Sequence, residues 1–586
     1  MKTRPFAVLL GLSFGAMASY AHSPDSTLQL STVPIWSQAP SAQSSLSQPD
    51  AMGLWSSGAD IRMTSPGASL LLSRDGYPSA YVQGSWEGLP LLAPDLGVAD
   101  FSLLPQWGQA RSWGTALASQ YQSGQALGEL LDVRGQGTDV LELKGSSLKA
   151  AGIGGIWTVS KTEKSSMRIG GGTEAWKNDY RHGDAGLRRN GADGNRQELF
   201  LTHERRYNGG RWSTGGTAYM VSADRGLPAS IFDFEDIPAR QQDLRAQVSQ
   251  YQSYNFEHLQ FRTEQVLWNQ NQFYQGPWYS DTNTSQGAYM RFYTGTHWKK
   301  WKLYNEETVG VNRMNGVYKP DVTINYVTLN LMAESPVTRL GKISLGAKWS
   351  AWDSKKSPFA PQVVWEKKTR SWTWSSQFRQ MFRFPTMNDL FWTGFGNPDL
   401  DPEKGWEANG TVRKSFPRGS VEAQVFSTQL QQAIIWLPDD FGNWRPVNQS
   451  SWDRQGAKLT GRYALKDWVF SANLRYVRVT DYDGNLAPYV APWLANAMVS
   501  RRWAKGEWAM TWTGQTAAPT FWAAPGSGPE AFLAAQSTFG FQYTHRLSAA
   551  WRANLSLENL FNQAIVFQPG YPMPGRYVQV RLSYSL

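Results

Sequence analysis

The sequence ends in YVQVRLSYSL (residues 577–586), in which apolar and polar side chains alternate to the last residue. Side chains along a β-strand point alternately to its two faces, so this segment predicts a strand with one apolar face and one polar face that carries Arg581. Two structures fit the pattern. One is the terminal strand of a soluble β-protein. The other is the last strand of a transmembrane barrel, where closure onto the first strand removes the edge, the apolar face meets lipid and the polar face meets the lumen.

Two motifs precede this strand, LSLENLFNQ (555–563) and YPMPGR (571–576). Together with the terminal strand they resemble the closing hairpin of TonB-dependent outer-membrane receptors, in which an ENLFN strand end and a YP-x-PGR turn come before the last strand. Many members of that family end in Phe, and Leu586 departs from this. The resemblance implies an all-β membrane protein: a large antiparallel transmembrane β-barrel of about 22 strands with an N-terminal plug domain inside it, in the outer membrane of a Gram-negative cell.

The composition agrees with a barrel and excludes several other classes. The 586 residues include 29 Trp, 24 Tyr, 26 Phe and 54 Gly, and Trp and Tyr favour the membrane–water interface. There is no Cys, which excludes a disulfide scaffold, thiolate-bound iron–sulfur clusters and thiol catalysis. The net charge of +10 is scattered along the chain, so it does not predict a nucleic-acid surface. We expect this basic excess to contact outer-membrane lipid and lipopolysaccharide.

Residues 1–21 have the features of a secretory signal peptide. Lys2 and Arg4 form a positively charged start, residues 6–18 are an apolar run, and Ser19-Tyr20-Ala21 is a small-residue cleavage site. The apolar run is too short to span a membrane as a helix. Residues 22–53 are then expected to form a periplasmic tail, of which residues 41–50 are rich in Ser, Gln and Pro, as in a flexible linker.

A short segment of this tail looks like the TonB box of the same family, an extended peptide that pairs with the periplasmic energy transducer by strand addition. The alternative is a disordered tail without a partner. If the resemblance holds, the partner is a TonB-type protein and the residues that bind it are Thr27, Leu28, Gln29, Leu30, Ser31, Thr32 and Val33.

Residues 54–135 consist of short apolar runs broken by Gly and Pro, which predicts a compact domain of small strands. WEGLPLL (86–92), DFSLLP (100–105) and YQSGQALG (121–128) occur in the order of the plug-domain landmarks of the receptor family. Glu87 and Glu129 depart from the family's usual residues. The resemblance implies that this segment is the plug.

From residue 136 to 586 the sequence predicts a series of amphipathic strands. Residues 470–476 and 508–513 alternate between the two kinds of side chain, and tight-turn residues such as Asn208-Gly209-Gly210 and Lys505-Gly506 separate such segments. At roughly 20 residues per strand and connection, this region accommodates on the order of 22 strands, a size at which the lumen has to be plugged.

Four polar segments are expected as extracellular loops: 177–197, 224–242, 269–286 and 437–452. The stretch FRFPTMNDLF (382–391) with GNPDLDPE (396–403) resembles a long signature of the receptor family. Heme-transporting members have a His ligand between its two halves, and this chain has none there. The segment around Ile434 to Asn448 resembles the cobalamin-receptor-like group.

No residues are arranged in the sequence for catalysis or for binding a metal. The six histidines, at positions 22, 182, 203, 258, 297 and 545, have no metal-ligand spacing, and no nucleophile elbow or phosphate loop is present. We therefore expect no catalytic residue, no cofactor and no enzyme activity.

Two functions stay open. The first is energised uptake of a scarce ligand, cobalamin or a ferric siderophore, by a monomeric receptor whose ligand-binding residues the sequence does not identify. The second is a passive or adhesive barrel without energy coupling. A secreted, Trp-rich carbohydrate-active enzyme is a more distant third interpretation.

Overall fold

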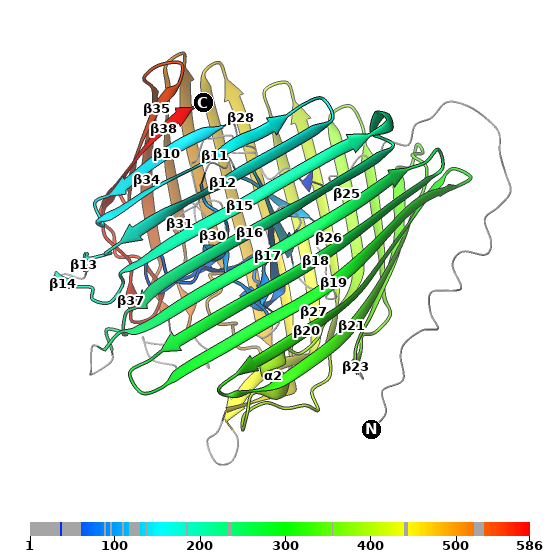
Figure 1. The fold of residues 1–586 in the computed structure, drawn as a ribbon, viewed down its shortest axis with the longest axis horizontal. Coiled ribbons are helices and arrows are strands. Elements are labelled where there is room, and N and C mark those ends of the chain that lie inside the picture. The colour runs from blue at the N-terminus through cyan, green and yellow to red at the C-terminus, as the bar shows by residue number, and fades with distance from the viewer. Residues whose placement is uncertain are drawn as a thin grey trace.

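A computed structural model describes residues 36–37, 60–86, 89–93, 96–107, 111–116, 129–135, 139–182, 186–232, 237–353, 355–438, 444–520 and 532–586. Among these residues, 22 long antiparallel strands form one closed barrel (Figure 1). Almost every strand pairs with the next strand along the chain, so the barrel is a continuous meander. The predicted fold class is confirmed.

The first eleven barrel strands are β10 (Val140–Ser146), β11 (Ala150–Lys161), β12 (Ser165–Trp176), β15 (Gly194–Tyr207), β16 (Trp212–Leu227), β17 (Ala239–Asn255), β18 (Leu259–Gln275), β19 (Ser280–Trp298), β20 (Trp301–Gly316), β21 (Lys319–Glu334) and β22 (Lys342–Trp352). The remaining eleven are β24 (Ala360–Lys368), β25 (Trp372–Arg383), β26 (Glu403–Phe416), β27 (Gly419–Pro438), β28 (Trp444–Leu465), β29 (Trp468–Asp481), β30 (Trp493–Trp503), β31 (Gly506–Gln515), β34 (Gln536–Arg546), β35 (Trp551–Glu558) and β38 (Tyr577–Ser585). Short elements in the connections are β13 (Arg181–His182), β14 (Leu187–Arg188), β23 (Lys355–Lys356), β32 (Ala518–Pro519), β33 (Phe532–Leu533), β36 (Val566–Gln568), β37 (Tyr571–Pro572), the 3-10 turn η3 (Asn208–Gly210) and the helix α2 (Met387–Phe391).

The last strand closes the barrel. β38 pairs with β10 in an unbroken antiparallel register from Val140 opposite Ser585 to Ser146 opposite Gln579. The backbone N–H of Leu586 extends the seam by donating to the carbonyl of Asp139 (3.1 Å). The seam is therefore paired along its length, as hydrocarbon surroundings require.

The two faces of β38 are oriented as the alternation predicts. Val580 is 50% exposed on the outer wall. Arg581 is buried on the lumen side, where its guanidinium lies 3.9 Å from the carboxylate of Glu142 on β10. The hydroxyl of Ser583 donates to the same carboxylate (3.2 Å). The apolar face is thus turned toward lipid and the polar face toward the lumen.

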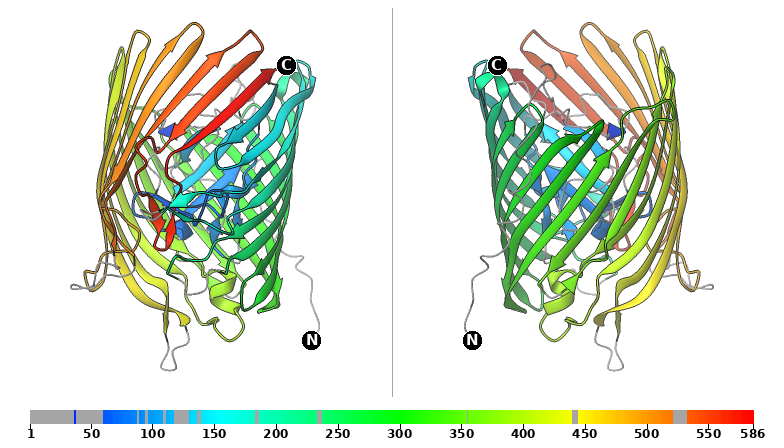
Figure 2. Two further views of the ribbon diagram at one scale, coloured as in Figure 1. Left: turned by 90° about the vertical axis from the view of Figure 1, so that its left-hand side faces the viewer. Right: turned by 90° about the vertical axis from the view of Figure 1, so that its right-hand side faces the viewer.

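An N-terminal group of short elements lies inside the barrel (Figure 2). It comprises β1 (Trp36–Ser37), β2 (Asp60–Arg62), β3 (Leu71–Ser73), η1 (Ser79–Tyr81), β4 (Val82–Trp86), β5 (Leu89–Pro90), β6 (Leu92–Ala93), β7 (Val98–Ala99), η2 (Phe101–Leu103), β8 (Arg111–Ala116) and β9 (Glu129–Gly135). Its main sheet has the order β1-β8-β9-β4-β5, with β4 and β9 parallel. We call this group the inner domain. The predicted domain boundaries at 21, 53 and 135 stay predictions.

The apolar core joins the inner domain to the wall. One buried cluster contains Leu72, Trp86 and Phe101 from the inner domain together with Phe200 and Val477 from inward positions of the barrel. The ring of Trp86 packs edge-on against Phe200, with centroids 5.5 Å apart. The inner domain is therefore fixed in the lumen partly by ordinary hydrophobic packing.

The connections divide the barrel into two different ends. The connections at one end, which we call the turn end, are short, as between β30 and β31, where Ala504 and Lys505 join the strands. Those at the other end, the loop end, include all the long ones, such as 384–402 and 559–576. In Figure 1 the turn end is at the top and the loop end, with α2, at the bottom. Short turns face the periplasm in bacterial barrels and longer loops face outward.

Two of the four predicted loops are wrong because most of their residues are strand. β18 continues to Gln275 and β19 begins at Ser280, so most of 269–286 is strand. Likewise β27 runs to Pro438 and β28 starts at Trp444, within the predicted loop 437–452. Membrane strands need only about 9–11 residues, and the ends of β18 and β19 within 269–286 are mainly polar, which resembles a loop in sequence.

The other two predicted loops lie at the loop end. The connection between β12 and β15 spans 177–193 and includes the small hairpin of β13 and β14. The connection between β16 and β17 spans 228–238 and is shorter than predicted. No helix among the described residues is long and apolar enough to cross a membrane.

The outward position of Leu582, close to the middle of β38, gives a test of the lipid-facing wall. Replacing Leu582 by Arg should lower the stability of the barrel by about 2–4 kcal/mol, because a cation would face the bilayer. Ser583→Arg is the matched control, since this neighbouring side chain points into the polar lumen. Urea unfolding in lipid vesicles measures both variants. Equal effects of the two substitutions would show that the face assignment is wrong.

Candidate functional site

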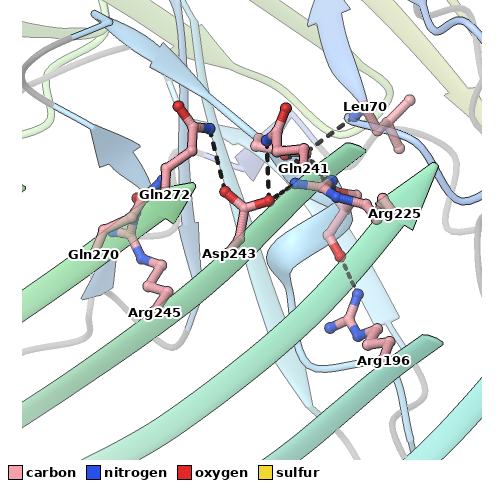
Figure 3. Close-up of polar contacts among 10 residues, drawn as sticks. Leu70, Arg196, Arg225, Gln241, Asp243, Arg245, Gln270 and Gln272 are labelled. Atoms are coloured by element: carbon pink, nitrogen blue, oxygen red, sulfur yellow. Dashed lines mark hydrogen bonds and ion pairs between the residues drawn. The ribbon is translucent and has the colours of Figure 1, made fainter. Parts of the chain in front are cut away.

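The inner domain is attached to one side of the wall through a buried ion-pair network centred on Arg225 of β16 (Figure 3). This guanidinium, 1% exposed, lies 3.1 Å from the carboxylate of Asp100 in the inner domain and also pairs with Asp243 on β17. It donates to the hydroxyl of Ser102 (2.6 Å) as well. Arg225 thus binds one carboxylate of the inner domain, Asp100, and one carboxylate of the barrel wall, Asp243.

Asp100 is prepared for this contact by its own segment. Its second carboxylate oxygen accepts hydrogen bonds from the backbone N–H groups of Leu70 and Ser102 (both 2.9 Å) and from the hydroxyl of Ser102 (2.6 Å). Asp100 is the N-cap of the short turn η2, a position at which a side-chain oxygen commonly satisfies a free N–H. The segment DFSLLP (100–105), which resembles a plug landmark of the family, therefore places Asp100 and Ser102 in contact with Arg225.

Two more wall arginines bind backbone carbonyls of the inner domain. Arg196 on β15 donates to the carbonyls of Ser102 and Leu104 and pairs with Glu198 (2.9 Å). Arg245 on β17 donates to the carbonyls of Pro90 (2.9 Å) and Leu91 (3.1 Å). Figure 3 shows these side chains rising from adjacent strands toward the inner domain.

Alternation along the strands explains why these side chains share a face. Asp243, Arg245 and Gln247 are two residues apart on β17, and all three are buried on the lumen side. Gln241 and Gln272 both donate to the carboxylate of Asp243 (2.9 and 3.2 Å), which fixes that carboxylate beside Arg225. A lumen wall of polar residues is usual in large barrels.

Ion pairs also attach the inner domain to the opposite side of the wall. Arg475 on β29 forms two hydrogen bonds with the carboxylate of Asp60 (2.5 and 2.9 Å). Lys458 on β28 lies 3.3 Å from the carboxylate of Asp75. The side chain of Arg454 donates to the carbonyl of Asp75 (2.6 Å) and covers the ring of Tyr77, 3.8 Å from its centroid. The inner domain is therefore held from both sides.

The segment 382–403, which resembles the family signature, links the wall to the inner domain near the loop end. Arg383 and Glu403 are both buried and form a bidentate ion pair between β25 and β26 (2.5 and 2.9 Å). Tyr81 of the inner domain donates its hydroxyl to the same carboxylate (2.9 Å). Thr386 and Asp389 form a capping box that starts α2. The signature therefore connects the wall, the inner domain and the long loop between these strands.

Trp107, which follows η2, packs against the barrel wall. Trp107 is buried against a flat surface of glycines on β11 and β12, where a Cβ on Gly154 would lie 2.5 Å and on Gly172 2.7 Å from its ring. Its backbone N–H donates to Glu198 (2.8 Å), and Lys144 lies over the ring, 4.0 Å from its centroid. Glycine is needed here because any side chain would displace the indole.

The loop end carries a group of aromatic side chains, most of them exposed. Trp392 packs against Phe395 and Trp436, with ring centroids 5.7 and 5.6 Å apart. The backbone N–H of Thr393 donates to the carbonyl of Tyr318 (3.0 Å), whose ring lies 6.4 Å from that of Tyr279. We call these residues, Tyr279, Tyr318, Trp392, Phe395 and Trp436, the aromatic crown. They come from three different connections and from the end of β27, so only the folded barrel brings them together.

The loop end carries nearly balanced charge among the residues that the structure describes. In its eleven connections, with the strand residues next to them, these described residues include 14 Lys and Arg and 13 Asp and Glu. The ranges counted are 146–150, 176–194, 224–242, 275–281, 313–321, 352–360, 383–403, 438–445, 481–493, 515–536 and 558–577.

The structure describes only some of the residues predicted from the sequence. Thr27 to Val33, the candidate TonB box, lies outside the described residues, as does the signal peptide 1–21. His203, His258, His297 and His545 lie at the turn end on separate strands or turns. Among the described residues, no group of three or more His, Cys, Asp and Glu side chains could hold a metal ion.

The docking residues of the wall were not predicted. Arg225 lies 125 positions from Asp100 and Arg475 lies 415 positions from Asp60. The sequence does show inward arginines at alternating positions of strands, but nothing in it pairs them with particular acids. Only Asp100 could have been found, as part of the quoted plug landmark.

Asp100 and Asp75 make docking dependent on pH. Burial raises the pKa of Asp100, but Arg225 and the hydrogen bonds from Ser102 and Leu70 outweigh it, so this pKa lies below the ordinary 3.8. Burial likewise raises the pKa of Asp75, and the cations Lys458, Arg74, Arg475 and Arg454 lower it by more. Both carboxylates are therefore ionised at neutral pH and stabilise docking in that form.

A carboxyl whose pKa is lowered on docking stabilises the docked state fully at pH values above the pKa that it has when undocked. This stabilisation is lost as the pH falls through the pKa of the docked state. We therefore expect the inner domain to stay docked from neutral pH down to about pH 4 and to loosen below that. Conductance in planar bilayers, recorded from neutral pH down to about pH 2.5, measures this. A rise in conductance already at about pH 5 to 6 would contradict the role assigned to these two carboxylates.

Removing the positive charge of Arg225 should undock the inner domain more directly than a change of pH. Arg225→Gln leaves Asp100 and Asp243 buried without their cation, which costs about 3–5 kcal/mol. Arg240→Gln is the matched control, because Arg240 on β17 pairs with Asp193 and Asp224 on the exposed surface (3.2 and 2.7 Å) and contributes about 0–1 kcal/mol. Protease cleavage within 60–107 and ion conductance should increase for the first variant alone. Equal behaviour of both would show that this network does not hold the inner domain.

Comparisons with known proteins agree with this architecture. Residues 153–560 match the family model described as TonB dependent receptor-like, beta-barrel. The FrpB iron transporter of Neisseria meningitidis has a similar structure, with a TM-score of 0.76 over 92% of this chain and 97% of that one, at 11% identity. A ferric enterobactin receptor (PfeA) mutant from Pseudomonas aeruginosa, in complex with enterobactin, also has a TM-score of 0.76 over the same shares, at 13% identity.

A short stretch is also similar to a curated relative. Over 106 residues the chain is 30% identical to the vitamin B12 transporter BtuB of Photobacterium profundum. This match covers 17% of each protein. At these identities the solved structures establish the fold alone, and the short match does not assign a ligand.

Proposed function

The chain belongs to the TonB dependent receptor-like β-barrel family, and we propose that it is an energised receptor that takes up cobalamin or a related metal chelate across the outer membrane. The family is one of receptors and transporters, and its members of this architecture lie in the outer membrane, as does this barrel. The loop end accordingly faces the outside and the turn end faces the periplasm.

The docked inner domain is the observation that carries the proposal. A barrel of 22 strands is wide enough to hold an aqueous channel unless its lumen is filled. The inner domain lies inside the barrel, and its contacts with the wall include ion pairs and hydrogen bonds, such as those of Arg225 with Asp100 and of Arg475 with Asp60. In a polar lumen these contacts can be exchanged for water when the domain is pulled, so the seal can open without unfolding the wall.

The aromatic crown supports the ligand class. Exposed rings such as Trp392 and Phe395 offer flat apolar surface at the loop end, which suits a ligand with a conjugated ring system. Cobalamin has such a ring system and therefore fits this end of the barrel. The absence of His between residues 391 and 396 disfavours heme.

Energy coupling is proposed through Thr27 to Val33, as the TonB box that a periplasmic TonB-type protein binds by strand addition. Pull on this segment would reach the inner domain through the linker that follows it. A monomer is expected, because each barrel contains its own path. The alternative is a passive or adhesive barrel in which the tail has no partner.

Transport assays with a tail variant separate these two functions. Leu30→Pro removes a backbone donor and fixes φ, so it prevents strand addition without touching the barrel. Surface binding of labelled cobalamin should stay within about twofold of the parent, while accumulation in the periplasm should fall to background. Leu30→Val, which keeps the N–H and favours an extended backbone, is the control and should transport normally.

The same cells can be tested with a ferric siderophore in place of cobalamin. Uptake of the siderophore but not of cobalamin would reject the proposed ligand and keep the energised receptor. If neither ligand accumulates in the parent strain, or if Leu30→Pro transports as well as Leu30→Val, the passive barrel is the better description.

A further inference from the structure

The basic charge of the barrel is concentrated at the turn end. Its ten connections, with the strand residues next to them, carry 24 Lys and Arg against 7 Asp and Glu, whereas the described residues of the loop end carry 14 Lys and Arg and 13 Asp and Glu. The ranges counted are 161–165, 203–212, 254–262, 297–302, 334–342, 366–372, 413–419, 462–468, 500–508 and 545–552. The basic excess, which is scattered along the sequence, is therefore gathered by the fold at the periplasmic end.

Aromatic rings accompany these cations. Lys299 lies over the ring of Trp298 and Lys414 over that of Trp372, each 5.0 Å from the centroid. Elsewhere at the turn end, the ring of Trp212 stacks between those of Tyr207 and Tyr254, with centroids 4.1 and 6.0 Å away. Trp and Tyr prefer the depth of lipid headgroups. The cations beside them are therefore placed at the headgroup level of the inner leaflet.

Three neighbouring turns form one dense part of this basic surface. The backbone N–H of Ala464 donates to the carbonyl of Arg418 (2.6 Å), and that of Arg502 donates to the carbonyl of Asp467 (2.9 Å), so the turns lie side by side. Residues 413–419, 462–468 and 500–508 together carry eight Lys and Arg and two acids, Asp467 and Glu507. Glu507 is paired with Arg502 (2.9 Å). We call these three turns the basic cluster.

Several cations of the basic cluster point to the surface. Lys414, Arg418, Lys466, Arg501 and Lys505 are exposed. Arg501 lies over the ring of Trp468, 5.3 Å from its centroid, so it is positioned at the level of the interfacial rings. Such a group of cations attracts phosphate groups on a membrane surface.

An apolar groove of about 520 Å³ lies on the outer wall directly beside the basic cluster. Its floor consists of small residues on three adjacent strands, because Gly461, Ala472 and Ala497 are paired in one row across β28, β29 and β30. Its sides include the exposed rings of Phe416, Tyr463 and Phe470. Arg462, which belongs to the basic cluster, also lines the groove.

We propose that the basic cluster and this groove form a binding site for an anionic phospholipid of the inner leaflet of the outer membrane. The phosphate group lies among Arg418, Lys466 and Arg501, and an acyl chain lies in the groove over Gly461. The site holds phosphatidylglycerol or cardiolipin in preference to phosphatidylethanolamine, whose headgroup has no net charge. The cations match the phosphate group of a lipid, and the adjoining apolar groove matches its acyl chain. These two parts are covalently joined in a lipid, as the two parts of the site adjoin in the protein.

The position of the site favours a phospholipid over lipopolysaccharide. Lipopolysaccharide occupies the outer leaflet, next to the loop end, where the described residues have no comparable excess of Lys and Arg. A polymer such as peptidoglycan would not use the groove, because the groove is apolar and lies on the wall. The predicted contact with lipopolysaccharide stays a prediction, and the charge distribution does not support it.

Native mass spectrometry of the full-length protein in detergent tests the proposal. Phosphatidylglycerol and phosphatidylethanolamine are titrated separately, and the dissociation constant of the first bound lipid is measured. We expect phosphatidylglycerol to bind about five- to tenfold more tightly, and the difference to shrink below about twofold at about 0.5 M NaCl, because salt screens exposed charges. The salt measurement uses the unaltered protein, so it does not depend on the folding of any variant.

A triple variant locates the site. Arg418→Gln, Lys466→Gln and Arg501→Gln together should remove the preference for phosphatidylglycerol, whereas Lys177→Gln, Lys355→Gln and Lys356→Gln at the loop end should leave it unchanged. The heat-dependent mobility shift on electrophoresis checks that both variants are folded. Equal binding of the two lipids by the parent protein overturns the proposal. So does an unchanged preference in the basic-cluster variant, or tighter binding of lipid A than of phosphatidylglycerol.

Discussion

The structure depends on the requirement that every backbone N–H and C=O in the hydrocarbon layer be paired within the protein. A sheet satisfies this only if it has no edge, so the pairing of β38 with β10 completes all the other strand pairings. The register between Ser146 and Gln579 at one end and Val140 and Ser585 at the other fixes which residues of both strands face lipid. A shift by one residue would turn Arg581 outward and Val580 inward.

Closure with 22 strands creates the second constraint, which is a wide and polar lumen. A domain placed there has to meet a wall of polar side chains, so it cannot be held by apolar contacts alone. The wall meets it with arginines that bind either carboxylates, as Arg225 binds Asp100, or backbone carbonyls, as Arg245 binds those of Pro90 and Leu91. Because buried charges are stable only when paired, the same contacts fix the orientation of the domain. The apolar cluster around Trp86 adds hydrophobic contacts between the domain and the wall.

Features that depend on local alternation could be predicted from the sequence. The terminal strand and its faces are confirmed, because alternation of Val580, Arg581 and Leu582 is itself the physical cause of their orientation. The long strands beyond the membrane were predicted as loops, since polar residues on both faces remove that signal, as in 269–275 of β18. The ion pairs of the docked domain could not be predicted, because Arg475 and Asp60 are brought together only by the closed barrel. The crown has the same origin: Tyr279 and Trp392 belong to connections that are far apart in sequence.

The different charge balance of the two ends reflects the surroundings of each end. At the turn end, short connections leave little room between the strands and the membrane surface, so Lys and Arg placed there lie at the level of phosphate groups. At the loop end, strands such as β27 and β28 continue well beyond the lipid, and their tips are far from any headgroup. Charge at those tips acts on dissolved ligands instead. A chain with a net charge of +10 can therefore concentrate cations at one end of its barrel and still present an aromatic surface with nearly balanced charge among its described residues at the other end, because the length of the connections decides which partner each charge reaches.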